Sequence, residues 1–155
     1  YDEGNIRVSS SEIRRLLQEG KVEMANALLT YPYQLRGRIV SGYKVGRTIG
    51  FPTANIEVDS PYKLLPKVGV YAVWVELLGK RYKGMLYIGK RPTLQNGDNL
   101  TIEVNILGFS GNAYNDEITV SFVYAVREDK TFESVEALRE QLERDRQTVD
   151  KLLVE

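Results

Sequence analysis

The spacing of apolar residues is helical at the start of the chain. Between Ser9 and Gly20 they recur every three or four positions, which predicts an amphipathic helix. Ser9 with Glu12 forms a capping-box pattern at its start, and Gly20 is a natural end. The apolar stripe consists of Ile13, Leu16 and Leu17. A second, shorter helix is predicted from Val22 to Leu29, before a proline-containing turn.

From Leu35 onward the pattern alternates between apolar and polar residues, which predicts strands. The expected strands are Leu35–Ser41, Val68–Leu78, Tyr82–Ile88, Leu100–Leu107 and Ile118–Val126. In the fourth strand, Leu100, Ile102, Val104 and Ile106 share one face, and Glu103 lies on the other. Five or six antiparallel strands without intervening helices indicate a small closed or Greek-key barrel.

The end of the chain returns to a helical period. Ser134 is a suitable N-cap for a long helix that extends to about Leu153. Its inward-facing residues are predicted to be Val135, Leu138, Leu142, Val149 and Leu152. We therefore expect a mainly β fold with short N-terminal helices and one long C-terminal helix.

Composition narrows the chemistry. The 155 residues include no cysteine and no histidine, which excludes disulfides, thiolate or His-ligated zinc and a Ser-His-Asp triad. Any proton transfer must fall to a carboxylate, Lys or Tyr. Twenty-one acidic residues balance twenty-one basic ones, so no nucleic-acid partner is expected. No apolar run of about 18 residues appears, so no membrane span is expected. The first residues look neither like an initiator nor like a signal peptide; we expect a cytoplasmic fragment of a longer chain.

The segment from Gly42 to Asn55 carries the clearest sign of a binding site. Glycines and the cations Lys44 and Arg47 fill its first part, which favours a loop around a phosphate group. Gly42 and Gly46 do not have the spacing of a P-loop, and Pro52 obstructs an immediate helix, so a Walker-type ATPase is disfavoured.

Thr53 and Asn55 follow that loop, two residues apart. In an extended segment their side chains lie on the same side, so one hydroxyl and one amide oxygen could hold a single Mg²⁺ beside a nucleotide. The alternative is a turn in which both side chains bond their own backbone.

Glu103 is the candidate catalytic residue. A carboxylate in the middle of a strand could accept the proton of an attacking hydroxyl in a phosphoryl transfer. The alternative is an ordinary surface glutamate.

Together these residues resemble the riboflavin kinase family, in particular the C-terminal kinase module of bacterial bifunctional riboflavin kinase/FMN adenylyltransferases. The resemblance depends on Gly50-Phe51-Pro52-Thr53-Ala54-Asn55 after the glycine loop, Gly69-Val70-Tyr71, Ile88 to Thr93, the Glu103 strand, and Phe132 with Leu138. It implies a six-stranded antiparallel Greek-key barrel that transfers the γ-phosphate of ATP to the riboflavin 5′-hydroxyl, giving FMN and ADP.

The resemblance also implies roles for single residues. Thr53 and Asn55 would bind Mg²⁺ and ATP, and Glu103 would be the catalytic base. The residues around the ATP phosphates would be Gly42, Lys44, Gly46, Arg47 and Pro52. By a weaker analogy Phe109, Tyr114 and Arg127 would border the flavin, with Gly108 and Gly111 allowing the connecting segment to act as a flap.

The chain departs from the family pattern at several positions. Tyr87-Ile88-Gly89 replaces a frequent Asn-Ile-Gly, and Asn105 and Gly108 replace a His and an Asp near the base. Upstream, Val8 to Arg14 resembles the closing motif of the adenylyltransferase module. We therefore expect residues 1–30 to be a helical remnant or linker of that module, which would be a partner in the full-length chain, and residues 31–155 to be the kinase domain.

Two other functions stay open at this point. A flavin-binding barrel without catalysis would not need Thr53, Asn55 and Glu103 together. An oligonucleotide-binding barrel would suit the basic segments and ten tyrosines, but zero net charge disfavours it.

Overall fold

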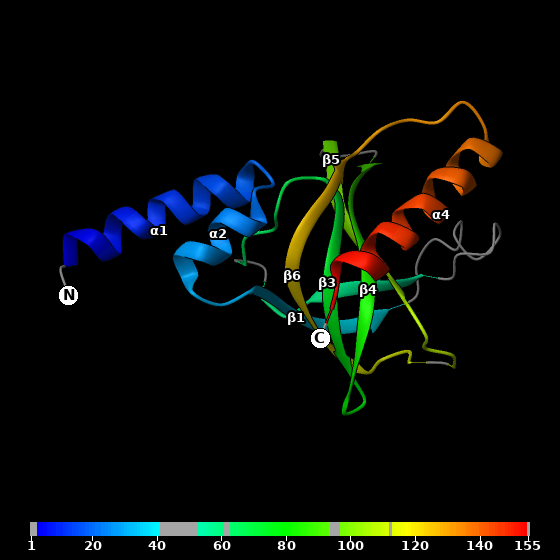
Figure 1. Ribbon diagram of the computed structural model, residues 1–155, viewed down its shortest axis with the longest axis horizontal. Coiled ribbons are helices and arrows are strands. Elements are labelled where there is room, and N and C mark those ends of the chain that lie inside the picture. The colour runs from blue at the N-terminus through cyan, green and yellow to red at the C-terminus, as the bar shows by residue number, and fades with distance from the viewer. Residues whose placement is uncertain (1–2, 41–52, 61–62, 94–96, 112, 155) are drawn as a thin grey trace.

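Antiparallel strands close into a six-stranded barrel in the computed structural model, which describes residues 3–40, 53–60, 63–93, 97–111 and 113–154 (Figure 1). The strands are β1 (Tyr33–Val40), β2 (Ala54–Val58), β3 (Gly69–Leu77), β4 (Lys80–Thr93), β5 (Gly97–Ile106) and β6 (Glu117–Glu128). Their order around the barrel is β1-β2-β5-β4-β3-β6. Since β6 returns to lie beside β3 after the β3–β4–β5 meander, the topology is a Greek key, as predicted.

The barrel has apolar side chains on both sides of its wall. The inner face of β3 contributes Val73 and Val75 to the interior core, and its outer face contributes Val70, Ala72 and Trp74 to a second cluster. This arrangement explains why the β3 sequence is apolar almost without interruption, because neither face is left to water. The outer cluster is covered by the C-terminal helix.

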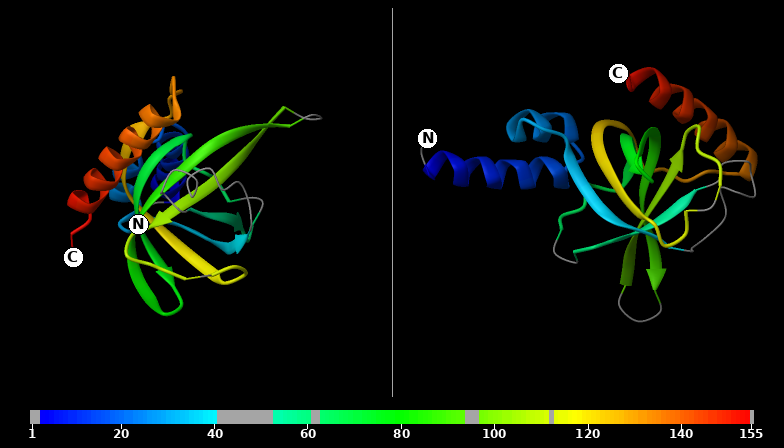
Figure 2. Two further views of the ribbon diagram at one scale, coloured as in Figure 1. Left: turned by 90° about the vertical axis from the view of Figure 1, so that its right-hand side faces the viewer. Right: turned by 90° about the horizontal axis from the view of Figure 1, so that it is seen from below.

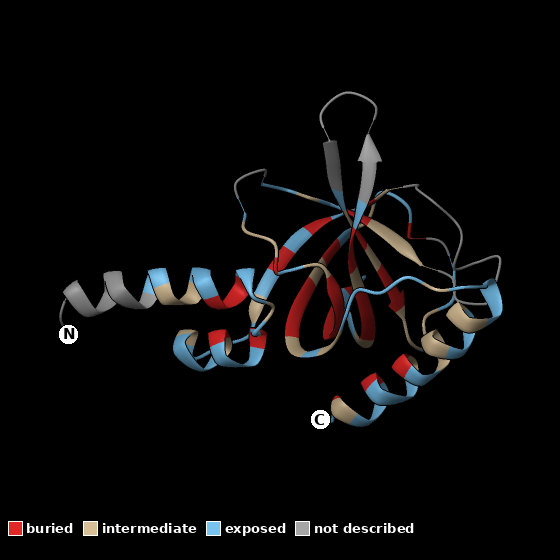
Figure 3. Ribbon diagram, turned by 90° about the horizontal axis from the view of Figure 1, so that it is seen from above, coloured by how far each residue is buried: buried red, intermediate tan, exposed pale blue. Residues whose placement is uncertain are grey.

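That helix, α4 (Val135–Leu152), begins as predicted at Ser134, whose hydroxyl accepts a hydrogen bond from the backbone amide of Ala137 at 3.0 Å. It packs along β4, β3 and β6 with Val149 and Leu153 fully buried (Figure 3). The helix therefore fixes the outer face of one part of the barrel wall.

The N-terminal helices α1 (Glu3–Gln18) and α2 (Val22–Leu29) lie together on another side of the barrel, and α1 extends away from it (Figures 1 and 2). Leu16, Leu17, Val22 and Ala25 belong to the same buried cluster as the barrel interior. Asn26 joins α2 to two strands: its amide donates to the Phe122 carbonyl at 2.7 Å and accepts from the Tyr33 amide at 2.8 Å.

Two details of the predicted elements were wrong. The first helix begins at Glu3, so Ser9 lies inside it and does not cap it. No proline interrupts the residues before Ser9, and a capping pattern alone does not stop a helix from extending upstream. Val135 is 58% exposed, although it was expected to face inward. Val135 is the first residue of its helix.

Candidate active site

Residues that are partners on neighbouring strands form a row of side chains around the barrel at one level. Asn55 of β2 pairs with Glu103 of β5, which pairs on its other side with Tyr87 of β4. Tyr87 pairs with Val70 of β3, and Val70 with Arg127 of β6. Their neighbours in sequence, such as Ile56, Val104, Leu86 and Ile88, belong to the interior core. Since strand side chains alternate between the two faces, this row lies on the outer face of the barrel, and we call it the outer-face row.

Glu103 lies between the predicted metal ligands and Tyr87 in this row. The Thr53 hydroxyl, just before β2, donates a long hydrogen bond of 3.5 Å to the Glu103 carboxylate. Thr53, Asn55 and Glu103 are all partly buried. The structure therefore brings together the three residues that sequence reasoning selected, from segments about 50 positions apart.

Burial raises the pKa of Glu103, and the hydrogen bond from Thr53 opposes this effect only in part. Within the described part of the chain, the Glu103 carboxylate forms no ion pair that would lower its pKa. A carboxylate in such surroundings binds a proton more readily than an exposed one, which is the property required of a general base.

Tyr87 extends the site toward the C-terminal helix. Its hydroxyl donates a hydrogen bond to the Asp129 carboxylate at 3.0 Å, in the segment between β6 and α4. Burial, followed by this bond, raises the pKa of Tyr87 to about 12, so its hydroxyl stays protonated near neutral pH. Sequence reasoning noted Tyr87 only as a departure from the family pattern and missed its contact with Asp129.

Arg127, predicted to border a flavin, occupies the far end of the row. Its guanidinium forms a salt bridge of 2.9 Å with Asp145 of α4, and Asp145 is 3% exposed. Gln141 donates a further hydrogen bond to Asp145 at 2.9 Å, and the guanidinium lies 5.6 Å from the centre of the Phe132 ring. Asp145 was also missed, although the sequence carries a signal: it interrupts the apolar stripe of α4 between Leu142 and Val149.

Phe109 and Tyr114, also predicted to border the flavin, lie in the connection from β5 to β6. The Phe109 ring packs edge-on against Tyr82 with 5.5 Å between ring centres, whereas Tyr114 is 55% exposed. Gly108 and Gly111 have φ values of 81° and 123°, which other residues rarely adopt. The connection is thus anchored by Phe109 and has the backbone conformation expected of a glycine-rich turn.

The remaining predicted phosphate-binding residues lie outside the described residues. They are Gly42, Lys44, Gly46, Arg47 and Pro52.

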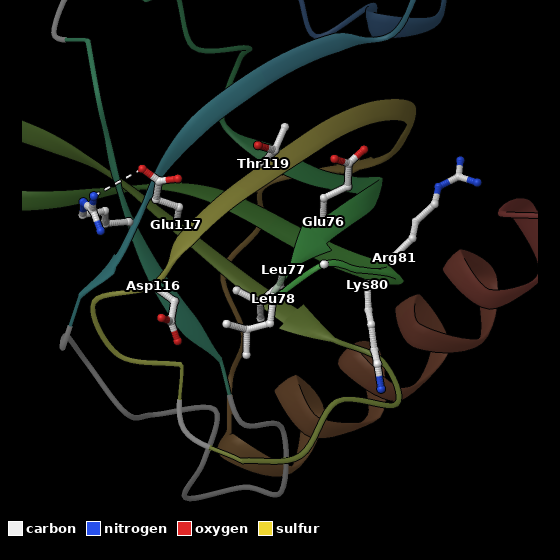
Figure 4. A pocket seen from close by; sticks show the side chains of 10 residues that line it. Glu76, Leu77, Leu78, Lys80, Arg81, Asp116, Glu117 and Thr119 are labelled. Carbon is white, nitrogen blue, oxygen red and sulfur yellow. Dashed lines mark hydrogen bonds and ion pairs between the residues drawn. The ribbon is translucent and has the colours of Figure 1, made fainter.

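A separate open pocket of about 660 Å³ lies at the tip of the β3–β4 hairpin (Figure 4). Its described lining consists of Glu76–Arg81, Asp116, Glu117 and Thr119, with Arg38 from β1. Arg38 and Glu117 form an exposed ion pair of 3.2 Å on one side, and Lys80 and Arg81 lie on the other. None of these residues was predicted for the site.

Comparison with known proteins decides the family. A family model described as Flavokinase, riboflavin kinase, matches residues 29–153. The chain belongs to the riboflavin kinase family. The outer-face row with Glu103 therefore lies in a riboflavin kinase domain, as the resemblance implied.

Relatives at the sequence level carry a second activity in their names. Bifunctional riboflavin kinase/FMN adenylyltransferase of Listeria monocytogenes is 45% identical over 141 residues, which cover 91% of this chain and 45% of that protein. The protein of the same name from Bacillus subtilis is 41% identical over 143 residues, covering 91% of this chain and 45% of that protein. The chain therefore spans less than half the length of these relatives.

Solved structures agree on the fold. Riboflavin kinase from Trypanosoma brucei superposes with a TM-score of 0.57 at 25% identity, covering 79% of this chain and 78% of that one. A structure described as a macrolide-efflux protein from Streptococcus pneumoniae superposes with a TM-score of 0.86 at 35% identity, covering 91% of this chain and 46% of that one. No helix among the described residues has the length and apolar character needed to cross a membrane.

Proposed function

We propose that this domain transfers the γ-phosphate of ATP to the 5′-hydroxyl of riboflavin, with Glu103 as the catalytic base. The bond from the riboflavin 5′-oxygen to the γ-phosphorus forms while the bond from that phosphorus to the bridging oxygen of ADP breaks. The hydroxyl proton passes to the Glu103 carboxylate. The observation that carries this proposal is the partly buried Glu103 beside Thr53 and Asn55 on one face of the barrel.

The proposed reaction uses Mg²⁺, and the residues present fit it. Thr53 and Asn55 offer neutral oxygen ligands, and Glu103 is a neighbouring carboxylate. Mg²⁺ prefers such ligands and keeps waters and phosphate oxygens in its other positions. The described residues contain no cluster of three or more His, Cys, Asp or Glu side chains that could hold a metal by themselves, so the site depends on Thr53 and Asn55. When bound, Mg²⁺ would neutralise phosphate charge.

The other assignments extend the same proposal. Gly42, Lys44, Gly46, Arg47 and Pro52 surround the ATP phosphates, and Phe109, Tyr114 and Arg127 border the flavin. The chain works beside an adenylyltransferase module of a longer protein, with residues 1–30 as the connection, and acts in the cytoplasm, where ATP is available.

The test is incubation with riboflavin, ATP and Mg²⁺, followed by chromatography for FMN. We expect FMN from the unmodified chain and almost none from Glu103→Gln. Glu57→Gln, which changes an exposed glutamate on the neighbouring strand β2, is the matched control and should keep its activity. If the chain binds riboflavin but makes no FMN, the noncatalytic flavin-binding barrel replaces this proposal.

A further inference from the structure

Glu103 divides the outer-face row into two sides, and Tyr87 lies on one of them. Asn55 flanks Glu103 on one side and Tyr87 flanks it on the other. If Thr53 and Asn55 hold the metal and nucleotide, that side of Glu103 is occupied. The acceptor must then approach Glu103 from the other side. In an in-line transfer the acceptor hydroxyl gives its proton to the base and faces the γ-phosphorus, so the acceptor lies beside Glu103. The Tyr87 side is then the acceptor side.

The Tyr87 ring is held in place along its own strand. Gly89 lies two residues further on the same face of β4, and a Cβ atom added there would come within 2.7 Å of the ring Cζ and of the hydroxyl oxygen. The ring therefore lies over the Gly89 backbone, in space that a larger residue would fill. This packing fixes the direction of the hydroxyl group.

That hydroxyl group holds the segment between β6 and α4. Its partner Asp129 directly follows β6 and is exposed. The same segment contacts β6 a second time through Phe132, whose ring lies 5.6 Å from the Arg127 guanidinium. The Tyr87–Asp129 bond is the attachment closer in the row to Glu103, whereas Arg127 is separated from Tyr87 by Val70.

We infer that Tyr87 is a positioning residue for the acceptor: from the strand position that pairs with Glu103, its hydroxyl holds Asp129 at the start of the segment between β6 and α4, and its ring forms the edge of the riboflavin side. This inference rests on the proposed kinase reaction. It assigns a role to a tyrosine at a position where the family pattern frequently has asparagine. Loss of the bond should weaken riboflavin binding and leave ATP binding unchanged.

The experiment compares Tyr87→Phe, Asp129→Ala and the double variant with the unmodified chain. Each single change removes the same hydrogen bond, and Tyr87→Phe retains the ring. We expect the KM for riboflavin to rise about fivefold to tenfold in each single variant, the effect of one hydrogen bond, with no further rise in the double variant. The KM for ATP should stay within about twofold.

Tyr33→Phe is the matched control. Tyr33 is also partly buried, and its hydroxyl donates to the Leu64 carbonyl at 2.6 Å in another part of the barrel. The Tyr33→Phe variant should lose about as much thermal stability as Tyr87→Phe, without a change in the KM for riboflavin. Quenching of riboflavin fluorescence measures the affinity for riboflavin without turnover.

The outcomes separate the two claims. If the unmodified chain makes no FMN, the proposed function fails. If it makes FMN and Tyr87→Phe leaves the KM and affinity for riboflavin unchanged, only the role of Tyr87 is wrong. An equal rise in the KM for ATP, or additive effects in the double variant, would also overturn the inference.

Discussion

Two carboxylates at or beside the outer-face row are in opposite situations. At the end covered by α4, Asp145 is 3% exposed and is bound by Arg127 and Gln141. Toward the Asn55 end, Glu103 is partly buried, and within the described residues its carboxylate has the Thr53 hydroxyl as hydrogen-bond partner and no cation. A buried acid that is paired with a cation can hold two elements together. A partly buried acid without a cation remains available to take a proton.

The largest effect is expected from Glu103→Gln. The amide keeps the size of the side chain but cannot accept the proton at neutral pH, so kcat should fall about 10²–10⁴-fold. ATP binding should persist, because Thr53 and Asn55 are untouched. Steady-state FMN formation and nucleotide titration measure the two quantities. A kcat close to that of the unmodified chain would show that Glu103 is not catalytic.

Asp145→Ala should produce the largest loss of stability. It leaves the Arg127 guanidinium, whose side chain is 17% exposed, without its partner, and breaking such a buried pair typically costs about 3–5 kcal/mol of unfolding free energy. Urea unfolding measures the change. Glu143→Ala removes an exposed pair with Arg146 on the same helix and should leave the stability almost unchanged.

A double change sharpens the same comparison. Arg127→Met with Asp145→Leu replaces the ion pair with apolar side chains and should recover most of the lost stability. If Arg127 serves only to hold α4, the double variant will regain its affinity for riboflavin together with its stability. If Arg127 also borders the flavin, as predicted, the affinity for riboflavin will remain low in a stable protein.

Asn55→Ala should raise the Mg²⁺ concentration needed for half-maximal activity about tenfold, because one of two proposed protein ligands is lost. Turnover should recover at high Mg²⁺. An unchanged Mg²⁺ titration would show that Asn55 is not a metal ligand.

The smallest effect concerns pH. Glu103 must be ionised to act as a base, and burial raises its pKa, so kcat should begin to fall on acidification at a higher pH than the ordinary glutamate value of about 4.3. The same shift affects stability. The folded state binds this proton more tightly than the unfolded state, so ionised Glu103 destabilises the fold above its folded pKa. This penalty shrinks as the pH falls through the folded pKa and is gone below the unfolded pKa. Glu103→Gln should therefore be slightly more stable than the unmodified chain at neutral pH but not at acidic pH, as measured by urea unfolding at both.

The barrel itself could be predicted because alternation and helical spacing are local signals. Ser134 as a cap, the end of the first helix just before Gly20 and the polar position of Glu103 all followed from short patterns. The start of the first helix at Glu3 did not, because a capping pattern also occurs inside helices.

The partners within the site were less accessible to sequence reasoning. Tyr87 and Asp129 are 42 positions apart, and Arg127 and Asp145 are 18 positions apart. Each pair meets only because strand register and the path of α4 bring the residues together. Neither the register nor the helix path can be inferred from a short sequence pattern. Asp145 still left a trace, as a charge on an apolar stripe.

The hydrogen-bonded registry that aligns Asn55, Glu103 and Tyr87 also limits how this domain can vary. Inserting or deleting one residue within β5 ahead of Glu103 would turn the carboxylate into the apolar interior and send Val104 or Ile102 out to the substrates. Length changes should therefore be tolerated in the connections between strands, whereas new substrate preferences must come from exchanging side chains in strands of constant length.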